Sequence, residues 1–255
     1  MDLSDQQLLR YSRQIMLPQV DVAGQERLLH ATVLVIGVGG LGSPVALYLA
    51  ASGVGRLILS DPDVVDLTNL QRQIAHATDT VGTLKVTSAA GRLQQINPEV
   101  VVESIPAVLE GDDLLAQVQR ADVVVDCTDN LASRFAINRA CVQAKKPLVS
   151  AAAIRWEGQI SVYQPAHANS PCYQCFYGNV NNIPQTCSQN GVIGPLLGIL
   201  GSMQAVETLK LLVGVGEPLM GRVLLLDALN MEWTEIRLPK RPDCLVCGQV
   251  AETKK

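Results

Sequence analysis

Four cysteines of this chain form two C-x-x-C pairs, Cys172 with Cys175 and Cys244 with Cys247. Each pair has the spacing of a zinc knuckle, and four thiolates together complete a closed tetrahedral zinc site. A closed site has no open coordination position, so we predict that the zinc ion is structural. The rival interpretation is a redox dithiol, which needs only one such pair, near a helix N-terminus.

A glycine-rich segment, residues 37–42, has the pattern G-x-G-G-x-G and follows the apolar, β-branched residues 32–36. Where a strand runs into such a loop and then into a helix, backbone N–H groups can approach a phosphate. Asp61 follows Gly37 by 24 residues, where a ribose-binding acid is expected. The alternative is a tight turn without a ligand, and the motif alone does not separate NAD from ATP. The predicted nucleotide-binding glycines are Gly37, Gly39, Gly40 and Gly42.

Polar residues further along the chain favour ATP. The loop at residues 69–73 is followed by Lys85 and by Asp129 and Asn130. In an open α/β sheet the carboxyl ends of the strands form the ligand crevice. Two cations and an amide suit a triphosphate, and a free carboxylate suits Mg²⁺, whereas a pyridine nucleotide needs fewer of them. We therefore predict one crevice that gathers Gly40, Asp61, Asn69, Gln71, Arg72, Lys85, Asp129 and Asn130.

The other cysteines and the histidines give weaker signals. Cys187 lies in a polar segment, residues 185–189, and is either a reactive thiol or an idle one. Cys127 and Cys141 have apolar neighbours, which predicts core positions. The histidines show no ligand spacing, so we expect surface or helix-cap positions for His30, His76 and His167.

Alternating strands and helices must position these residues. Strands are predicted at 32–36, 56–60, 100–105 and 122–126 and from 147 onward, with helices at 85–95 and 134–144. This alternation is typical of a doubly wound parallel sheet. After about residue 155 the pattern changes, and strands at 159–164, 222–227 and 231–238 accompany one long apolar helix at 192–213.

The predicted fold class is therefore α/β: a Rossmann-like, doubly wound, mostly parallel sheet. N-terminal helices precede the sheet, and an antiparallel C-terminal extension carries the four-cysteine zinc site. We expect a single domain over residues 1–248, followed by a polar tail at 249–255.

Charge is scarce in this chain of 255 residues, with 20 Lys and Arg against 24 Asp and Glu and a net charge of −4. Nucleic acid is excluded as the main partner, because its phosphates require a basic field. The first residues are acidic and polar, unlike a signal peptide, so we expect a cytoplasmic protein.

No charged residue occurs between residues 158 and 206, a run of 49. Glycines and Pro195 interrupt its apolar part, whereas a membrane span needs about 20 apolar residues. We therefore expect no membrane span. Small residues allow close helix contact, so we predict that the helix at 192–213 lies in a homodimer interface or under the sheet. The glycines in question are Gly194, Gly198 and Gly201.

Together the motifs resemble the MoeB/ThiF/HesA family, the prokaryotic relatives of ubiquitin-activating enzymes. The resemblance rests on residues 10–15, 37–42, 69–73 and 126–130, on residues 158–159 and on the paired C-x-x-C motifs. It implies an ATP-dependent adenylyltransferase. In that family a small ubiquitin-like sulfur carrier ends in Gly-Gly, its carboxylate attacks the α-phosphate of ATP, and pyrophosphate leaves.

The resemblance also implies residue roles. Asp129 would hold Mg²⁺, Asp61 would bind the ribose and Asn69 would position phosphate. Arg72 and Lys85 would stabilise charge on the phosphate oxygens. Arg13 would reach into the ATP site of a partner subunit, which makes the active unit a homodimer. The cysteine matching Cys187 takes part in covalent sulfur transfer in ThiF-like enzymes and is dispensable in MoeB-like ones.

Within the family, residues 150–155 and 157–159 favour the MoeB type. That type adenylates a MoaD-type carrier for molybdopterin and molybdenum-cofactor biosynthesis, with sulfur supplied by a separate donor protein. The first alternative is a ThiF-type enzyme with a ThiS-like carrier in thiamine biosynthesis. More distant alternatives are an NAD-dependent oxidoreductase, which has no use for two such cations together with zinc, and a non-catalytic scaffold for a ubiquitin-like protein.

Overall fold

A computed structural model describes residues 3–178 and 191–248 of the chain. Three short helices begin it: α1 (Asp5–Arg10), α2 (Ser12–Ile15) and α3 (Asp21–His30). Ser4 caps α1, since its side chain accepts from the N–H of Gln7 while the Gln7 side chain accepts from the Ser4 N–H. The predicted N-terminal helices are therefore confirmed, and α3 leads directly into the first strand.

Within the described residues the strands form one eight-stranded sheet of order β3-β2-β1-β4-β5-β6-β7-β8. The first five pair in parallel and the last three are antiparallel. This arrangement confirms the predicted fold class. The strands are β1 (Thr32–Ile36), β2 (Arg56–Ser60), β3 (Val101–Ile105), β4 (Val123–Asp126), β5 (Leu148–Ile154), β6 (Glu157–Tyr163), β7 (Arg222–Asp227) and β8 (Glu232–Arg237).

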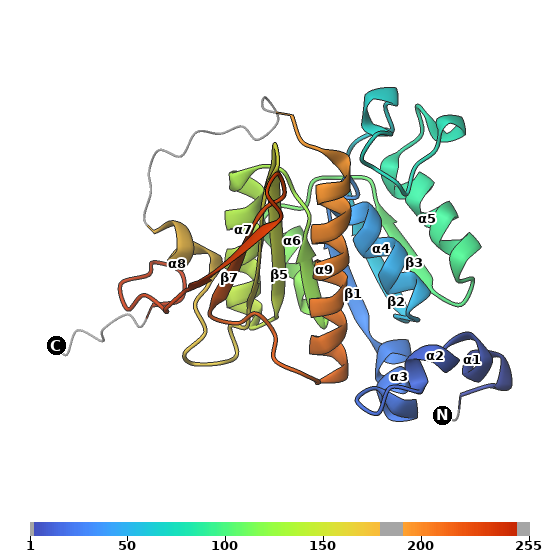
Figure 1. Ribbon diagram of the computed structural model, residues 1–255, viewed down its shortest axis with the longest axis horizontal. Coiled ribbons are helices and arrows are strands. Elements are labelled where there is room, and N and C mark those ends of the chain that lie inside the picture. The colour runs from blue at the N-terminus through green and yellow to red at the C-terminus, as the bar shows by residue number, and fades with distance from the viewer. Residues whose placement is uncertain (1–2, 179–190, 249–255) are drawn as a thin grey trace.

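Helices cover both faces of the sheet (Figure 1). On one face lie α4 (Gly42–Ala51), α5 (Lys85–Ile96) and α9 (Gly194–Val213), and on the other α6 (Gly111–Arg120) and α7 (Leu131–Ala144). Alternation along β1 serves both layers, because Val33 and Val35 face the first and Leu34 and Ile36 the second. Burying each such side chain stabilises the fold by about 1.5–3 kcal/mol. Short elements complete the chain: η1 (Leu67–Asn69), η2 (Thr78–Thr80) and α8 (Tyr173–Tyr177).

Helix α9, which contains the apolar part of the charge-free run, covers the sheet. It packs against α3, α4, β4, β5 and β6, and Figure 1 shows it lying in front of the sheet beside α4. By length and composition alone α9 could cross a membrane, but half of its most apolar window is buried inside the protein, as in a core helix. Of the two predicted positions for this helix, the one on the sheet is confirmed.

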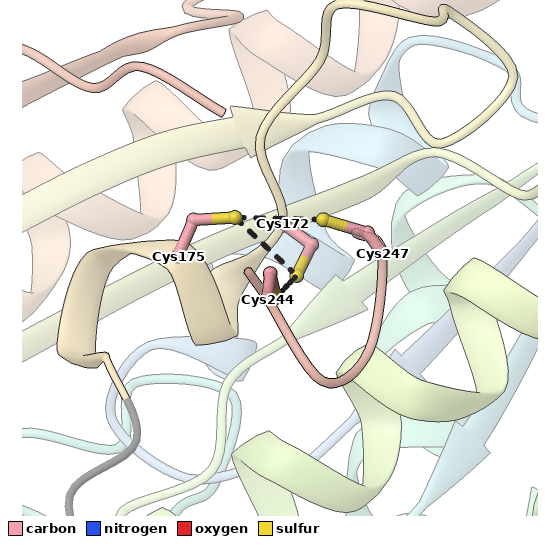
Figure 2. A group of neighbouring side chains, drawn as sticks. All are labelled: Cys172, Cys175, Cys244 and Cys247. Atoms are coloured by element: carbon pink, nitrogen blue, oxygen red, sulfur yellow. Dashed lines mark hydrogen bonds between the residues drawn. The ribbon is translucent and has the colours of Figure 1, made fainter. Parts of the chain in front are cut away.

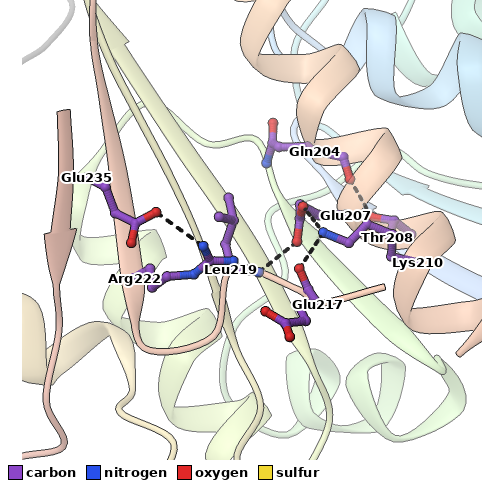
Figure 3. A network of polar contacts seen from close by, with 8 residues as sticks. All are labelled: Gln204, Glu207, Thr208, Lys210, Glu217, Leu219, Arg222 and Glu235. Atoms are coloured by element: carbon purple, nitrogen blue, oxygen red, sulfur yellow. Dashed lines mark hydrogen bonds and ion pairs between the residues drawn. The ribbon is translucent and has the colours of Figure 1, made fainter. Parts of the chain in front are cut away.

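A polar network fixes the C-terminal half of α9 (Figure 3). Glu207 is the first charged residue after the run, and it is buried. Its carboxylate pairs with Lys210 at 2.6 Å and accepts from the N–H of Leu219 at 2.8 Å. Gln204 has no exposed surface and donates to the Asp126 carbonyl oxygen at 2.9 Å. These bonds join α9 to the end of β4 and to the segment that leads into β7.

The sequence prediction omitted α6 and α8. Leu114, Leu115 and Val118 have helical spacing, so the pattern for α6 was present in the sequence. Helix α8 is only five residues long, too short for a periodic pattern to predict it.

Candidate active site and metal centre

A cavity of about 510 Å³ opens where the strand order reverses, beside β1. Its walls come from the carboxyl ends of β1, β2 and β4, the position at which open α/β sheets bind ligands. The predicted site residues among its lining are Gly37, Gly39, Gly40, Asp61, Gln71, Arg72, Lys85, Asp129 and Asn130. Most of the predicted crevice is therefore assembled in one place.

Two glycines of the 37–42 loop serve different purposes. Gly37 has a φ of +89°, which disfavours any residue with a Cβ, and a Cβ there would also lie 2.7 Å from the Cys127 carbonyl oxygen. A Cβ on Gly42 would overlap the Gly37 carbonyl group, so Gly42 allows α4 to begin close against the loop. Gly42 therefore shapes the turn and does not line the cavity.

Acidic residues at the end of β2 fix the loop and the nearest cation. Asp61 is buried; one carboxylate oxygen accepts from the N–H of Val38 at 2.7 Å and the other from the N–H of Asp63 at 3.0 Å. Asp63 in turn pairs with the buried Lys85 ammonium at 2.7 Å. Lys85 is thus held at the start of α5. Asp63 also lines the cavity, although the sequence analysis did not predict it as a site residue.

The opposite wall offers a free carboxylate. Asp129 is exposed and makes no hydrogen bond to the described residues, so its oxygens are available to a cation. Asn130 is committed locally, since its side chain accepts from the Ser133 N–H and caps α7. Arg72 also lines the cavity, and its guanidinium donates to the Thr68 carbonyl oxygen at 3.0 Å.

Two other predicted residues lie apart from the cavity wall. Asn69 is half-buried, with its amide 3.5 Å from the Thr68 hydroxyl, and it is not among the lining residues. Arg13 is exposed on α2. Helices α2 and α3 pack together where β1 begins, whereas the cavity lies where β1 ends. Within one chain, Arg13 is therefore remote from the cavity.

Arg134 is a cation of this site that the sequence reading missed. It lines the cavity, is only 4% exposed and donates to the Thr128 carbonyl oxygen. Burial acts to lower the pKa of Arg134, but the Asp126 carboxylate together with Tyr173 and Tyr177 more than offsets burial, so the pKa of Arg134 is raised. Asp126 itself accepts from Thr128 and Ser150. The sequence did offer a signal for Arg134, because it lies four residues after Asn130, one turn into the helix.

The expected surface or cap position is wrong for His76. Its side chain is buried behind the glycine loop, with Nδ1 2.9 Å from the Ser88 hydroxyl and Nε2 3.0 Å from the Val38 carbonyl oxygen. Burial, reinforced by the neighbouring Lys85, lowers its pKa despite the Val38 bond and the charge of Asp61. The ring is accordingly neutral at pH 7.

The four cysteines form one cluster (Figure 2). Their sulfurs lie within 4.8 Å of one another, with Sγ–Sγ distances of 4.0 Å for Cys172–Cys175, 3.7 Å for Cys172–Cys244 and 3.4 Å for Cys175–Cys247. Tetrahedral zinc with Zn–S bonds of about 2.3 Å requires sulfurs roughly 3.8 Å apart. The donor set and its spacing therefore fit a structural zinc ion.

Three cysteines lie outside the two C-x-x-C pairs, and two of them are buried. Cys127 and Cys141 are buried, as predicted, and burial raises the pKa of both thiols. Cys127 touches the cavity, but a neutral thiol is a poor nucleophile. Cys187 lies outside the described residues, so its role stays a prediction.

The sequence pattern of the ThiF family matches residues 11–246, and the chain belongs to that family. Molybdopterin-synthase adenylyltransferase of Escherichia coli K12 is 46% identical over 248 residues, 97% of this chain and 99% of that protein. The sulfur carrier protein ThiS adenylyltransferase of the same strain is 42% identical over 246 residues, 96% and 97% of the two chains.

Among solved structures, Escherichia coli MccB with ATP has a TM-score of 0.79 at 27% identity, covering 94% of this chain and 74% of that chain. The predicted family resemblance is therefore confirmed. Both named relatives are adenylyltransferases, enzymes that transfer AMP, and this confirms the expected enzyme class.

Proposed function

We propose that this chain adenylates the C-terminal Gly-Gly carboxylate of a ubiquitin-like sulfur carrier of the MoaD type, for molybdenum-cofactor biosynthesis. The observation that carries the proposal is the single cavity that combines a glycine loop, three cations and a free carboxylate. Those cations are Arg72, Lys85 and Arg134, and the carboxylate is Asp129. The similarity to molybdopterin-synthase adenylyltransferase supports the choice of carrier.

The reaction suits these groups because it moves negative charge. The carrier carboxylate forms a bond to the α-phosphorus of ATP, the bond to the bridging oxygen breaks, and pyrophosphate leaves with the electron pair. The carboxylate is ionised at pH 7, so no general base is required. Arg72 and Lys85 stabilise the charge that accumulates on the phosphate oxygens and on the leaving pyrophosphate.

Two metal ions belong to the proposal. Asp129 is the residue that would hold Mg²⁺, which when bound neutralises phosphate charge. Cys172, Cys175, Cys244 and Cys247 would hold Zn²⁺, whose role is to join the segment after β6 to the C-terminal segment. The ATP carried by the solved MccB structure supports this nucleotide for the cavity.

The active unit in this proposal is a homodimer of single adenylation domains, each over residues 1–248, located in the cytoplasm. Arg13 then completes the ATP site of the partner subunit, which accounts for its distance from the cavity of its own chain. Light scattering tests the dimer, and cell fractionation tests the location. Mixing Arg13→Ala with Asp129→Ala chains tests the shared site, because a mixed dimer restores one complete cavity.

Pyrophosphate exchange into ATP tests the function. We expect exchange that depends on Mg²⁺ and on a MoaD-type carrier ending in Gly-Gly, and none with a carrier lacking the final glycine. Exchange with a ThiS-type carrier alone would instead favour the thiamine pathway, which the similarity to the ThiS enzyme keeps as the second candidate. Absence of exchange with every Gly-Gly carrier would overturn the proposal.

A further inference from the structure

His76 connects the glycine loop to the helix that begins at Lys85. Its Nε2 lies 3.0 Å from the Val38 carbonyl oxygen, in the middle of the loop, and its Nδ1 lies 2.9 Å from the hydroxyl of Ser88, one turn after Lys85. A carbonyl oxygen only accepts, so Nε2 must carry the proton. In the neutral ring Nδ1 is then unprotonated and faces the Ser88 hydroxyl, whose single proton is shared between Nδ1 and the Thr80 hydroxyl, 3.0 Å from Ser88.

The hydrogen bond from His76 to the Val38 carbonyl also determines where the Gly39 N–H points. The Val38 carbonyl and the Gly39 N–H belong to the same planar trans peptide unit, so the two groups point opposite ways. Gly39 lines the cavity, and its N–H donates no hydrogen bond to the part of the chain that the structure describes. Holding the carbonyl toward His76 therefore turns the Gly39 N–H away from the ring.

The backbone N–H of Val38 is held in place as well. The N–H of Val38 donates to Asp61 at 2.7 Å, and Val38 has no exposed surface. Between them, Asp61 and His76 leave the Val38–Gly39 peptide one orientation. Backbone N–H groups that are held in advance bind a phosphate without a cost of reorganisation.

We propose that His76 is a positioning residue of the adenylation reaction, which aims the Gly39 N–H at a phosphate of the bound nucleotide. This inference rests on the proposed function, because it needs a nucleotide phosphate in the cavity. His76 itself lies behind the loop and touches neither substrate. Its effect should fall on nucleotide binding, leaving zinc content and carrier affinity unchanged.

Two uncharged variants separate the two contacts of the ring. Glutamine places an amide near the position of Nε2, so His76→Gln keeps a donor for Val38. Asparagine places its amide near the position of Nδ1, so His76→Asn keeps the Ser88 contact and loses Val38. We expect His76→Asn to raise the Kd for ATP with Mg²⁺ about tenfold or more, the effect of losing a hydrogen bond to a charged group. His76→Gln should stay within about threefold of the wild type.

Calorimetry with ATP and Mg²⁺, without carrier, measures these constants, and the melting temperature and zinc content check folding. Equal Kd values for His76→Asn and the wild type, or equal losses in both variants, would overturn the inference. A wild type that binds no ATP would overturn the proposed function and this inference together. Normal ATP binding by the wild type with no difference between the variants removes only the inference.

The wild-type protein provides a test that does not depend on a variant folding. The chain has only three histidines, so ¹⁵N NMR can resolve each ring. We expect His76 as the neutral Nε2–H tautomer at pH 7, with an Nε2 signal that shifts when ATP and Mg²⁺ are added. An Nδ1–H tautomer, or an unchanged signal with nucleotide bound, contradicts the proposed role.

Discussion

Asn138 donates a hydrogen bond from its side-chain amide to the sulfur of Cys172, 3.6 Å away. Its side-chain oxygen also accepts from the backbone N–H of Tyr173 at 2.8 Å. Asn138 is buried on α7, and Arg134, one turn earlier on the same helix, lines the nucleotide cavity. One helix therefore contacts both the candidate metal centre and the candidate active site.

The first prediction concerns this contact. Replacing Asn138 by alanine removes the amide that supports a sulfur of the proposed zinc site, and such losses lower metal affinity about 10–100-fold. Chelator competition measures the zinc affinity. Arg139→Ala, an exposed change at the next position of α7, is the control and should bind zinc like the wild type. An unchanged zinc affinity for Asn138→Ala would show that the cluster does not depend on α7.

The second prediction uses two glycines of α9. A Cβ on Gly201 would overlap Pro44 and lie 2.6 Å from the Leu41 carbonyl oxygen, whereas a Cβ on Gly198 meets nothing within 4 Å. Gly201→Ala should destabilise the fold by about 1–3 kcal/mol, because α9 and α4 must separate. Gly198→Ala should be neutral or stabilising by up to about 1 kcal/mol, since alanine favours a helix. Urea unfolding of both variants measures the difference, and equal stabilities would contradict the close contact.

The third prediction concerns the free carboxylate at the cavity. Asp129→Asn removes the charge proposed to hold Mg²⁺, so pyrophosphate exchange should fall about a hundredfold or more. The melting temperature should not change, because Asp129 is exposed and holds no other described residue. Asp113→Asn, an exposed change on α6, should keep full exchange. Retained activity in Asp129→Asn would remove this residue from the proposed mechanism.

The fourth prediction separates two kinds of sulfur chemistry. For a MoeB-type enzyme we expect Cys187→Ser to exchange pyrophosphate at the wild-type rate and to support sulfur transfer in the presence of the donor protein. Mass spectrometry of the wild type with ATP and carrier should detect no adduct on Cys187. A covalent carrier adduct that disappears in Cys187→Ser would instead indicate ThiF-type chemistry.

Features encoded in a few neighbouring residues could be predicted from the sequence. The glycine loop, Asp61 at the end of β2 and the paired cysteines all follow from local spacing. As expected, the structure places the loop and Asp61 in one cavity and the four cysteines in one cluster. The parallel strands were also recognisable, because each is a short apolar run between turn residues.

Contacts between distant residues could not be predicted in this way. The bond between His76 and Val38 spans 38 positions, so no spacing rule indicated that the ring is buried behind the loop. The glycines of α9 look alike in the sequence, yet only the packing partner distinguishes Gly201, which faces Pro44, from Gly198, which faces open space. In our proposal Arg13 acts in the ATP site of a second chain. The geometry between two chains cannot be predicted from one sequence.

The cysteine cluster joins residues that are 72 positions apart, with Cys244 and Cys247 near the end of the chain. During synthesis the strands β1 to β6 are complete long before these two cysteines emerge, and N-terminal parts of a chain fold first. The zinc ion that we propose for this cluster would therefore acquire its full set of ligands only on a nearly finished chain. Metal uptake would then mark the last step of maturation, and truncated chains would be distinguished by their failure to retain the ion.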